Sequence, residues 1–188
     1  AFLKYDYSKI TGWTSLTLSE NKTRFEQINN GRWFNSNFDR PFSLSSVLIY
    51  DFDTKRSLAT NFTFQTGDPV TLPIALFKPV DSDFGFGRSR YLASDRNAYR
   101  MPSFHKLDVS YTVKSAMAKG SSWTFGVYNI YARKNPFYVK DEQILNFKDP
   151  TIGDLSVTGM NAKLVGVNLF TILPYVSFSK KLFNSKSK

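Results

Sequence analysis

The chain has 188 residues, of which 16% are aromatic and 21% are charged, with a mean hydropathy of −0.31. No run comes near the roughly 18 consecutive apolar residues that a membrane-spanning helix needs, so a helical membrane protein is not expected. Cysteine is absent, which excludes disulfides and thiolate metal sites. The net charge of +10 allows nucleic acid, anionic lipid headgroups or acidic ligands as partners.

From the start of the chain, apolar and polar residues alternate with period two, the pattern of a strand with one apolar face. β-Branched and aromatic residues fill these stretches, as strands favour. In the clearest case, Leu107, Val109, Tyr111 and Val113 alternate with Lys106, Asp108, Ser110 and Thr112. The alternation predicts seven strands, over residues 1–7, 12–20, 41–53, 57–67, 104–115, 122–134 and 164–182.

Short and long connections alternate between these strands. The short ones cover 8–11, 54–56 and 116–121, and the long ones, expected to be irregular, cover 21–40, 68–103 and 135–163. Structureless connections of that length are uncommon in compact soluble domains, whereas outer-membrane β-barrels combine short periplasmic turns with long extracellular loops. The alternation therefore predicts that every long connection is extracellular and every short one periplasmic.

Longer motifs lie within several of the predicted strands and connections. Arg100–Ser110 reads RMPSFHKLDVS, and Phe125–Pro136 reads FGVYNIYARKNP. The others are Thr11–Ser19 with Phe25–Phe34, then Phe64–Pro73, and finally Leu173–Ser179. Taken in this order, the motifs resemble the late strands of TonB-dependent outer-membrane transporters, and they cover nearly the whole chain.

The resemblance implies an all-β fold in which residues 1–183 form the C-terminal strands, about seven, of an antiparallel transmembrane β-barrel of about 22 strands with a plugged lumen. It implies a place in the outer membrane of a Gram-negative cell and the import of a glycan, a peptide or a chelated metal. The polar tail 184–188 departs from the family pattern, in which chains usually end on an aromatic residue.

The same resemblance implies the partners. They are outer-membrane lipid and lipopolysaccharide, the remaining barrel strands and plug domain, and the TonB energy-transducing complex acting through an N-terminal part outside these residues. Many relatives also act with a surface lipoprotein lid.

Because single-chain bacterial barrels have even strand numbers and lipid does not tolerate open sheet edges, an odd count of seven predicts that more strands precede Ala1.

The alternation also assigns faces to the strands. The side chains expected to face lipid are Leu107, Val109, Tyr111, Val113, Val176 and Phe178. Those expected to face the lumen are Asn61, Gln65, Lys106 and Asp108, and any ligand contacts are expected from these side chains and from the three long connections. The aromatic residues that suit the membrane interfaces are Trp13, Trp123, Tyr131, Phe137 and Tyr138.

We expect no catalytic residues, no cofactor and no metal site. The single histidine, His105, has only Asp108 near it in the sequence, and metal or nucleophilic chemistry needs more partners. Asp81 and Asp83 form an isolated Asp-x-Asp pair, which is weak support for calcium. Residues 83–90 superficially resemble an RNA-binding aromatic motif, but the amphipathic helices of such a fold are missing from the pattern, so nucleic acid is not an expected partner.

Two functions of other classes stay open at this point. One is a transporter-like barrel that serves as a structural scaffold or partner in a larger outer-membrane complex. The other is a soluble β-sandwich or lectin-like binding module, although such a module has no reason to keep its long and short connections on opposite sides.

Overall fold

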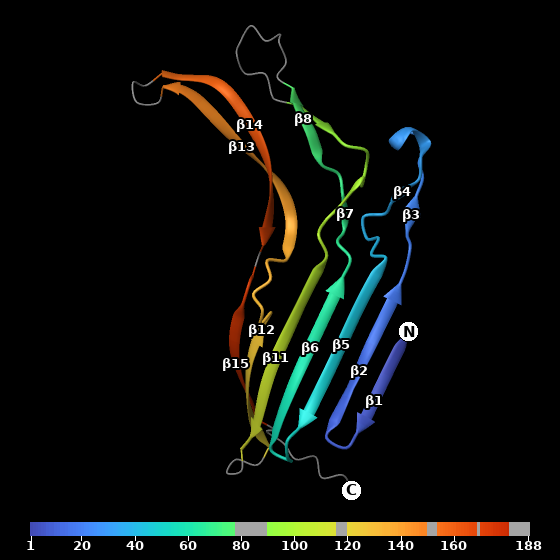
Figure 1. Cartoon of the computed structure of the whole chain (residues 1–188), viewed down its shortest axis with the longest axis vertical. Coiled ribbons are helices and arrows are strands. Elements are labelled where there is room, and N and C mark those ends of the chain that lie inside the picture. Colours follow the sequence, from blue (N-terminus) through green and yellow to red (C-terminus); the bar gives the residue numbers. More distant parts are fainter. Residues whose placement is uncertain (78–89, 116–119, 150–153, 169, 181–188) are drawn as a thin grey trace.

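Seven strands form one antiparallel sheet in the computed structural model, which describes residues 1–77, 90–115, 120–149, 154–168 and 170–180. The order across the sheet is β1-β2-β5-β6-β11-β12-β15, so each strand pairs with the one that precedes and follows it among these seven (Figure 1). The bounds are Phe2–Tyr7 (β1), Ile10–Leu18 (β2), Phe42–Asp51 (β5), Arg56–Gln65 (β6), Phe104–Lys114 (β11), Ser121–Tyr128 (β12) and Leu173–Lys180 (β15). The predicted all-β class and seven-stranded sheet are confirmed.

Two predicted strands are wrong in extent. The strand expected over 122–134 ends at Tyr128, because Asn129 and Ala132 have φ angles of 52° and 54° that turn the chain away. The strand expected over 164–182 is divided between two elements. Its first residues belong to β14, and β15 begins only at Leu173.

The long connections contain further strands, so the expectation that they are irregular is also wrong. The largest is the hairpin of β13 (Pro136–Asp149) and β14 (Asp154–Asn168), which projects beyond the sheet (Figure 1). Its alternation is hidden in the sequence because 140–143 are four consecutive polar residues and because the pairing contains register shifts. The smaller pairs are β3 (Lys22–Thr23) with β4 (Phe34–Asn35), β7 (Pro69–Val70) with β10 (Tyr99–Arg100), and β8 (Pro73–Phe77) with β9 (Arg90–Ala93); η1 (Asn29–Gly31) is a single 3₁₀ turn.

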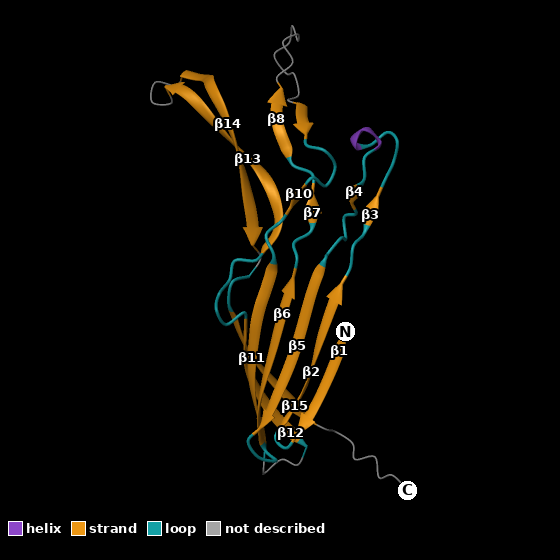
Figure 2. Cartoon of the chain, turned by 45° about the vertical axis from the view of Figure 1, so that its right-hand side comes forward, coloured by secondary structure: helices purple, strands orange, loops and turns teal. Residues whose placement is uncertain are grey.

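The short turns and the long connections lie at opposite ends of the sheet, as the sequence predicts. Figure 2 shows the turns β1–β2 and β5–β6 at the lower end, and β3, β4, β7, β8, β13 and β14 above the upper end. We call these the turn end and the loop end. In the β5–β6 turn, Asp53 Oδ1 accepts hydrogen bonds from the backbone N–H groups of Lys55 and Arg56, at 2.8 and 2.9 Å. In the connection 116–121, residues 116–119 lie outside the described part of the chain.

The register divides the sheet into two faces of different chemistry. On β6 and β11, Leu107 lies opposite Phe62, and Tyr111 lies opposite Leu58. These residues define the apolar face, which continues through Trp123 and Phe125 to Phe178 and Val176. The alternate residues define the polar face, where Asp108 lies opposite Asn61, Lys106 opposite Thr63, and Phe104 opposite Gln65. The residues that the sequence assigned to lipid therefore all lie on the apolar face, and those that it assigned to the lumen all lie on the polar face.

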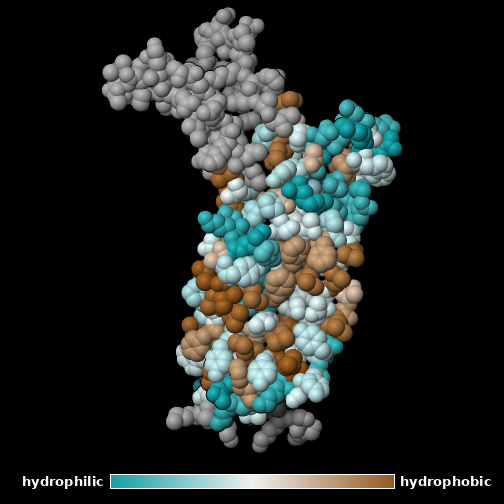
Figure 3. Space-filling model, viewed as in Figure 1, coloured by the Kyte–Doolittle hydropathy of each residue, from teal (hydrophilic) through white to brown (hydrophobic). Residues whose placement is uncertain are grey.

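The apolar face is not covered by another part of the described chain. Trp123, Phe125, Val176 and Phe178 are 46 to 61% exposed. The sheet is curled, and β12 and β15 pass behind β11 in both Figure 1 and Figure 2. Figure 3 shows one side of the molecule, where apolar side chains gather over the strands and hydrophilic ones lie toward both ends. No helix in the described ranges is long and apolar enough to span a membrane.

A tyrosine from each outer strand covers a glycine on the neighbouring strand. Tyr5 lies opposite Gly12 in the register, and its hydroxyl donates to the Val47 carbonyl at 2.9 Å. At the other edge Tyr175 lies opposite Gly126, and its ring occupies the space that a Cβ would need. Such aromatic cover is a known way to pin strand register beside a glycine. Trp13 lies on the polar face instead of an apolar belt, with its ring stacked 6.0 Å from Phe2.

Replacing Gly126 with valine should displace the Tyr175 ring, because the new Cβ would clash with it. Overpacking of this kind costs about 1–3 kcal/mol, which urea unfolding of the full-length protein would show as a lower midpoint. Adding Tyr175→Ala to the same variant should recover most of that loss. An equal loss in the single and double variants would contradict the proposed packing.

Candidate functional site

Three chain segments are joined at the loop end of the polar face by one buried ion pair. Asp39, which precedes β5, is 2% exposed and accepts a hydrogen bond from Arg100 Nη2 at 2.5 Å. Arg100 Nη1 also donates to the carbonyls of Asp39 and Gly67, at 2.7 and 3.0 Å. The Asn21 backbone N–H donates to Asp39 Oδ1 at 2.7 Å. The pair therefore ties the ends of β5 and β6 to the approach of β11.

The Asp39 carboxylate stays charged in this setting. Burial alone would raise its pKa, but the hydrogen bonds from Asn21 and Arg100 outweigh burial and hold the pKa of Asp39 below its usual value. The stabilisation from a carboxyl with a lowered pKa is present above the pKa of the unfolded chain and is lost as the pH falls through the lowered value. The junction is therefore fully formed at neutral pH.

Gly67 lets two of these segments touch. A Cβ at this position would collide with the carbonyl of Met101, so only glycine allows the backbone after β6 to lie against the backbone before β11. Met101 is itself buried at 8% exposure, and its N–H donates to the Asp68 carbonyl at 3.0 Å. The backbones of these two segments are thus in direct contact at the junction.

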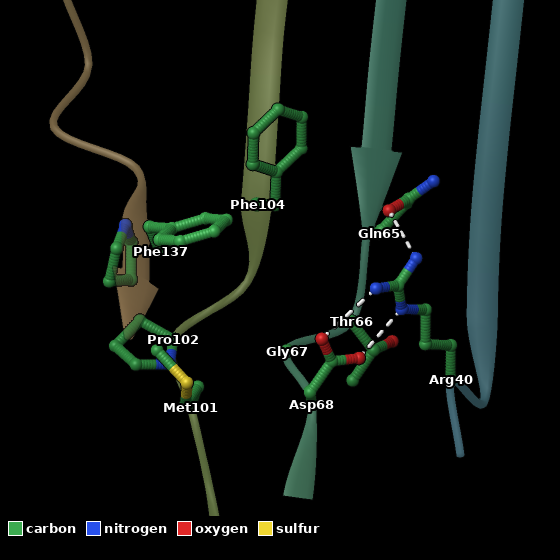
Figure 4. Close-up of a pocket in the computed structure, with 10 residues that line it drawn as sticks. Arg40, Gln65, Thr66, Gly67, Asp68, Met101, Pro102, Phe104 and Phe137 are labelled. Carbon is green, nitrogen blue, oxygen red and sulfur yellow. Dashed lines mark hydrogen bonds and ion pairs between the residues drawn. The ribbon is translucent and has the colours of Figure 1, made fainter. Parts of the chain in front are cut away.

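A cavity of about 270 Å³ opens directly in front of this junction. Arg40, Asp68 and Met101, which line it, are the chain neighbours of Asp39, Gly67 and Arg100. Gln65, Phe104 and Phe137 also line the cavity. Figure 4 shows Phe104, Phe137 and Pro102 on one side and Arg40, Gln65 and Asp68 on the other. One wall is therefore apolar and the opposite wall is polar.

The polar wall is a fixed arrangement of planar groups. Arg40 donates from Nε and Nη2 to the two oxygens of Asp68, at 2.7 and 3.0 Å, and from Nη1 to Gln65 Oε1 at 3.0 Å. Arg40 and Asp68 are 44% and 40% exposed in their side chains. Because the paired geometry is bidentate, it fixes the orientation of both groups, and because both are accessible, their remaining hydrogen-bonding positions face solvent.

A second polar cluster fastens the β12–β13 connection to β11. Asp108 Oδ1 accepts the backbone N–H of Asn129 at 3.0 Å, and Asp108 Oδ2 pairs with Lys106. Asn129 is fully buried, and its amide donates to the carbonyls of Arg133, at 2.8 Å, and Thr171. Asn tolerates the left-handed backbone conformation found here better than most residues do. Asp108 and Asn129 thus hold the β12–β13 connection against β11.

Asn135 extends this cluster, because its side-chain amide bonds to the backbone of β11 as a neighbouring strand would. Its Oδ1 accepts the N–H of His105 at 3.0 Å, and its Nδ2 donates to the His105 carbonyl at 2.9 Å. Arg133 donates to the Ser103 carbonyl at 3.1 Å. The asparagines and the arginine of the FGVYNIYARKNP motif therefore hold the end of β11, where the sequence alone left their role open.

The residues predicted to face the lumen fall into two groups. Gln65 lines the cavity, whereas Asn61, Lys106 and Asp108 lie farther along the same face. Lys106 is paired with Asp108 and also lies 4.3 Å from the centre of the Tyr128 ring. Arg40, Asp68 and Phe137 belong to the long connections from which ligand contacts are expected, but the sequence did not single out Arg40 or Asp68 and assigned Phe137 to a membrane interface. Phe104, at the start of β11, was not predicted as a lining residue.

The other candidates from the sequence lie elsewhere. His105 is on the apolar face, stacked on Phe64 and hydrogen-bonded through Nδ1 to the Tyr131 hydroxyl at 2.8 Å. Asp81 and Asp83, and most of the 83–90 motif, fall outside the described residues. Among the described residues there is no group of three or more His, Cys, Asp or Glu side chains placed to hold a metal ion.

Comparisons with protein-family models, with curated proteins and with solved structures find no match to this chain. Its function is therefore inferred from the sheet, from the residues at its loop end and from the motifs in its sequence.

Removing one partner from the buried and the exposed ion pairs should have different effects. Asp39→Ala leaves Arg100 without its carboxylate and should cost about 3–5 kcal/mol, whereas Asp68→Ala breaks an accessible pair and should cost about 1 kcal/mol or less. Native-state proteolysis of the 19–41 segment measures both losses as free energies of local opening. Equal protease sensitivity of the two variants would show that the Asp39–Arg100 pair does not hold the junction.

Proposed function

We propose that this chain forms the C-terminal part of the barrel wall of a TonB-dependent transporter in the outer membrane of a Gram-negative cell. In this proposal the apolar face contacts lipid, the polar face contacts the lumen, and the loop end is extracellular. The transporter imports a nutrient through the plugged barrel, driven by the TonB complex. The observation that carries the proposal is an exposed apolar face bordered at both ends by rows of aromatic side chains.

At the loop end, the aromatic row consists of Phe42, Phe64, His105 and Tyr131. Neighbouring ring centres lie 5.5 Å apart for Phe42 and Phe64, 6.0 Å for Phe64 and His105, and 5.7 Å for His105 and Tyr131. Each ring thus lies beside the next, on β5, β6, β11 and the connection that follows β12. Girdles of aromatic residues at the membrane interfaces are typical of outer-membrane barrels.

At the turn end, a second row crosses the same face. Tyr50 and Phe52 are 4.9 Å apart, and Phe52 and Tyr111 are 6.2 Å apart, measured between ring centres. Farther across the sheet, Trp123 and Phe178 are 4.8 Å apart. Trp123, which the sequence predicted for an interface, belongs to this row.

The full length of the longest strand of the sheet also suits a membrane. The 11 residues of β11 span about 34 Å at about 3.4 Å per step. At the strand tilt of about 40° found in outer-membrane barrels, this length covers about 26 Å along the membrane normal, close to the roughly 25 Å height of their apolar band. A soluble sheet has no reason to combine this length with an exposed apolar face.

The sheet edges support the same proposal. In the described residues, β1 is paired only with β2, and β15 only with β12. Unpaired backbone groups are costly in lipid, and barrels satisfy them by closure. We therefore propose that other strands of the same barrel pair with both edges, and that the plug domain and the TonB-contacting segment belong to the rest of that protein. The proposed import function itself rests on the motif resemblance.

An arginine placed on the apolar face should impair assembly far more than one on the polar face. Val109→Arg would put a charge toward lipid between the two aromatic rows, at a cost of about 2–4 kcal/mol, whereas Thr112→Arg, on the opposite face of the same strand, would point into the lumen. The amount of heat-modifiable, folded protein in outer-membrane fractions compares the two. Equal loss in both variants would remove the proposed assignment of faces.

Cysteine labelling on intact cells tests which end of the sheet is outside. Single cysteines at Asn30, Ser94 and Asp149 should react with a membrane-impermeant thiol reagent, and a cysteine at Lys55 should react only after the outer membrane is opened. The natural chain has no cysteine, so background labelling is low. Reaction at Lys55 but not at Ser94 in intact cells would invert the proposed orientation.

A further inference from the structure

We infer that the cavity at the loop end binds a neutral sugar ring, so that the transporter proposed above takes up a carbohydrate. The inference adds a substrate class to the proposed function. It rests on that function only where it takes binding at this cavity as a step in uptake. The binding itself depends on Arg40, Gln65, Asp68, Phe104 and Phe137, which line one cavity.

The polar wall offers hydrogen-bond donors and acceptors side by side. The contacts among Arg40, Asp68 and Gln65 use three of the five guanidinium N–H groups and two of the roughly four lone-pair positions of the carboxylate. Donors on Arg40 and acceptors on Asp68 therefore remain beside each other. Vicinal hydroxyl groups match this pattern, because each hydroxyl donates one hydrogen bond and accepts others.

The net formal charge of the cavity lining favours a neutral ligand. Among the residues that the structure describes, Arg40 and Asp68 are the only ionisable ones that line it, and they neutralise each other. An anionic ligand such as a phosphate or a carboxylate chelate would meet one cation already paired with a carboxylate. A cationic ligand would meet the reverse arrangement. A charged ligand of either sign therefore gains no net electrostatic attraction from the lining. A polyhydroxylated ring, in contrast, gains hydrogen bonds without leaving a charge unpaired.

The apolar wall suits the faces of a sugar ring. Phe104 and Phe137 stand opposite the polar wall in Figure 4, beside Pro102. Aromatic rings carry negative charge on their faces, which attracts the weakly positive C–H bonds that line one face of a pyranose. Phe137 is 65% exposed, so its ring is accessible to a ligand. The cavity of about 270 Å³ is below the roughly 300–1,000 Å³ of pockets for larger ligands, which fits a single ring.

The junction behind the cavity holds these groups in place before a ligand arrives. Arg100 donates hydrogen bonds to both Asp39 and Gly67, and each of these three residues is the chain neighbour of a lining residue. Preorganisation of this kind lowers the entropic cost of binding. The exposed pair Arg32–Asp95, with N and O 2.6 Å apart, resembles Arg40–Asp68 in chemistry but lies outside the cavity. It is therefore a matched control.

Titration of the purified full-length protein with small ligands, followed by ligand-observed NMR, tests the inference. The protein is kept in a detergent without a sugar headgroup, because a glycoside detergent would compete. The probes are the methyl pyranosides of glucose, galactose and mannose, with glucuronate as an anionic sugar and glycyl-phenylalanine amide as a peptide. At least one methyl pyranoside should bind saturably, and more tightly than glucuronate or the peptide.

The variants locate the binding. Phe137→Ala should weaken the bound pyranoside about two- to tenfold through loss of the ring face, and Asp68→Asn should weaken it about tenfold or more. The controls Phe38→Ala and Asp95→Asn, on exposed loop residues outside the cavity, should leave affinity unchanged. Absence of saturable pyranoside binding, tighter binding of the peptide, or affinity unaffected by Phe137→Ala and Asp68→Asn would each overturn the inference. The cysteine-labelling pattern is independent of these results, so a failed sugar site and a failed membrane assignment give different outcomes.

Discussion

The ten-residue register between β6 and β11 is the constraint on which the other features depend. It pairs Leu58 with Tyr111 and Phe62 with Leu107 on one face, and Asn61 with Asp108 on the other. Because side chains alternate along a strand, a shift by one residue would exchange the two faces completely. The same register sets Gln65 beside Phe104 at the end of both strands, and so determines which side chains meet at the cavity.

At the ends of the strands, hydrogen bonds from side chains replace the regular backbone pairing of the sheet. At the loop end, the Arg100 guanidinium bonds to Asp39 and to the Gly67 carbonyl, across three strands. One strand farther, Asn129 and Asn135 bond to Asp108 and His105. Both clusters supply hydrogen bonds to backbone groups at points where regular pairing has stopped, and buried backbone groups need such partners. The long connections therefore begin from fixed positions.

The sequence predicted those features that depend on local periodicity. The alternation around Leu107 and Val109 is regular enough to reveal both the strand and its faces, because every second side chain meets the same surroundings. The β13–β14 hairpin was missed because residues 140–143 are all polar and the pairing contains register shifts. The Arg40–Asp68 pair joins positions 28 residues apart. Their contact follows from the β5–β6 register, which a single sequence does not reveal in detail.

The tyrosine and glycine pairs at the two outer strands have a consequence for how the sheet finds its neighbours. Tyr5 and Tyr175 both belong to edge strands, and each needs an empty site on the strand inside it. If β15 slid by two residues, which would preserve its faces, Tyr175 would meet Thr124 or Tyr128, where a side chain already occupies the space. Each outer strand is thus keyed to a single alignment. The backbone N–H and C=O groups at its outer edge are therefore fixed in position along the strand direction. The register of any further strand that pairs with this edge is then set by the register of the inner strands.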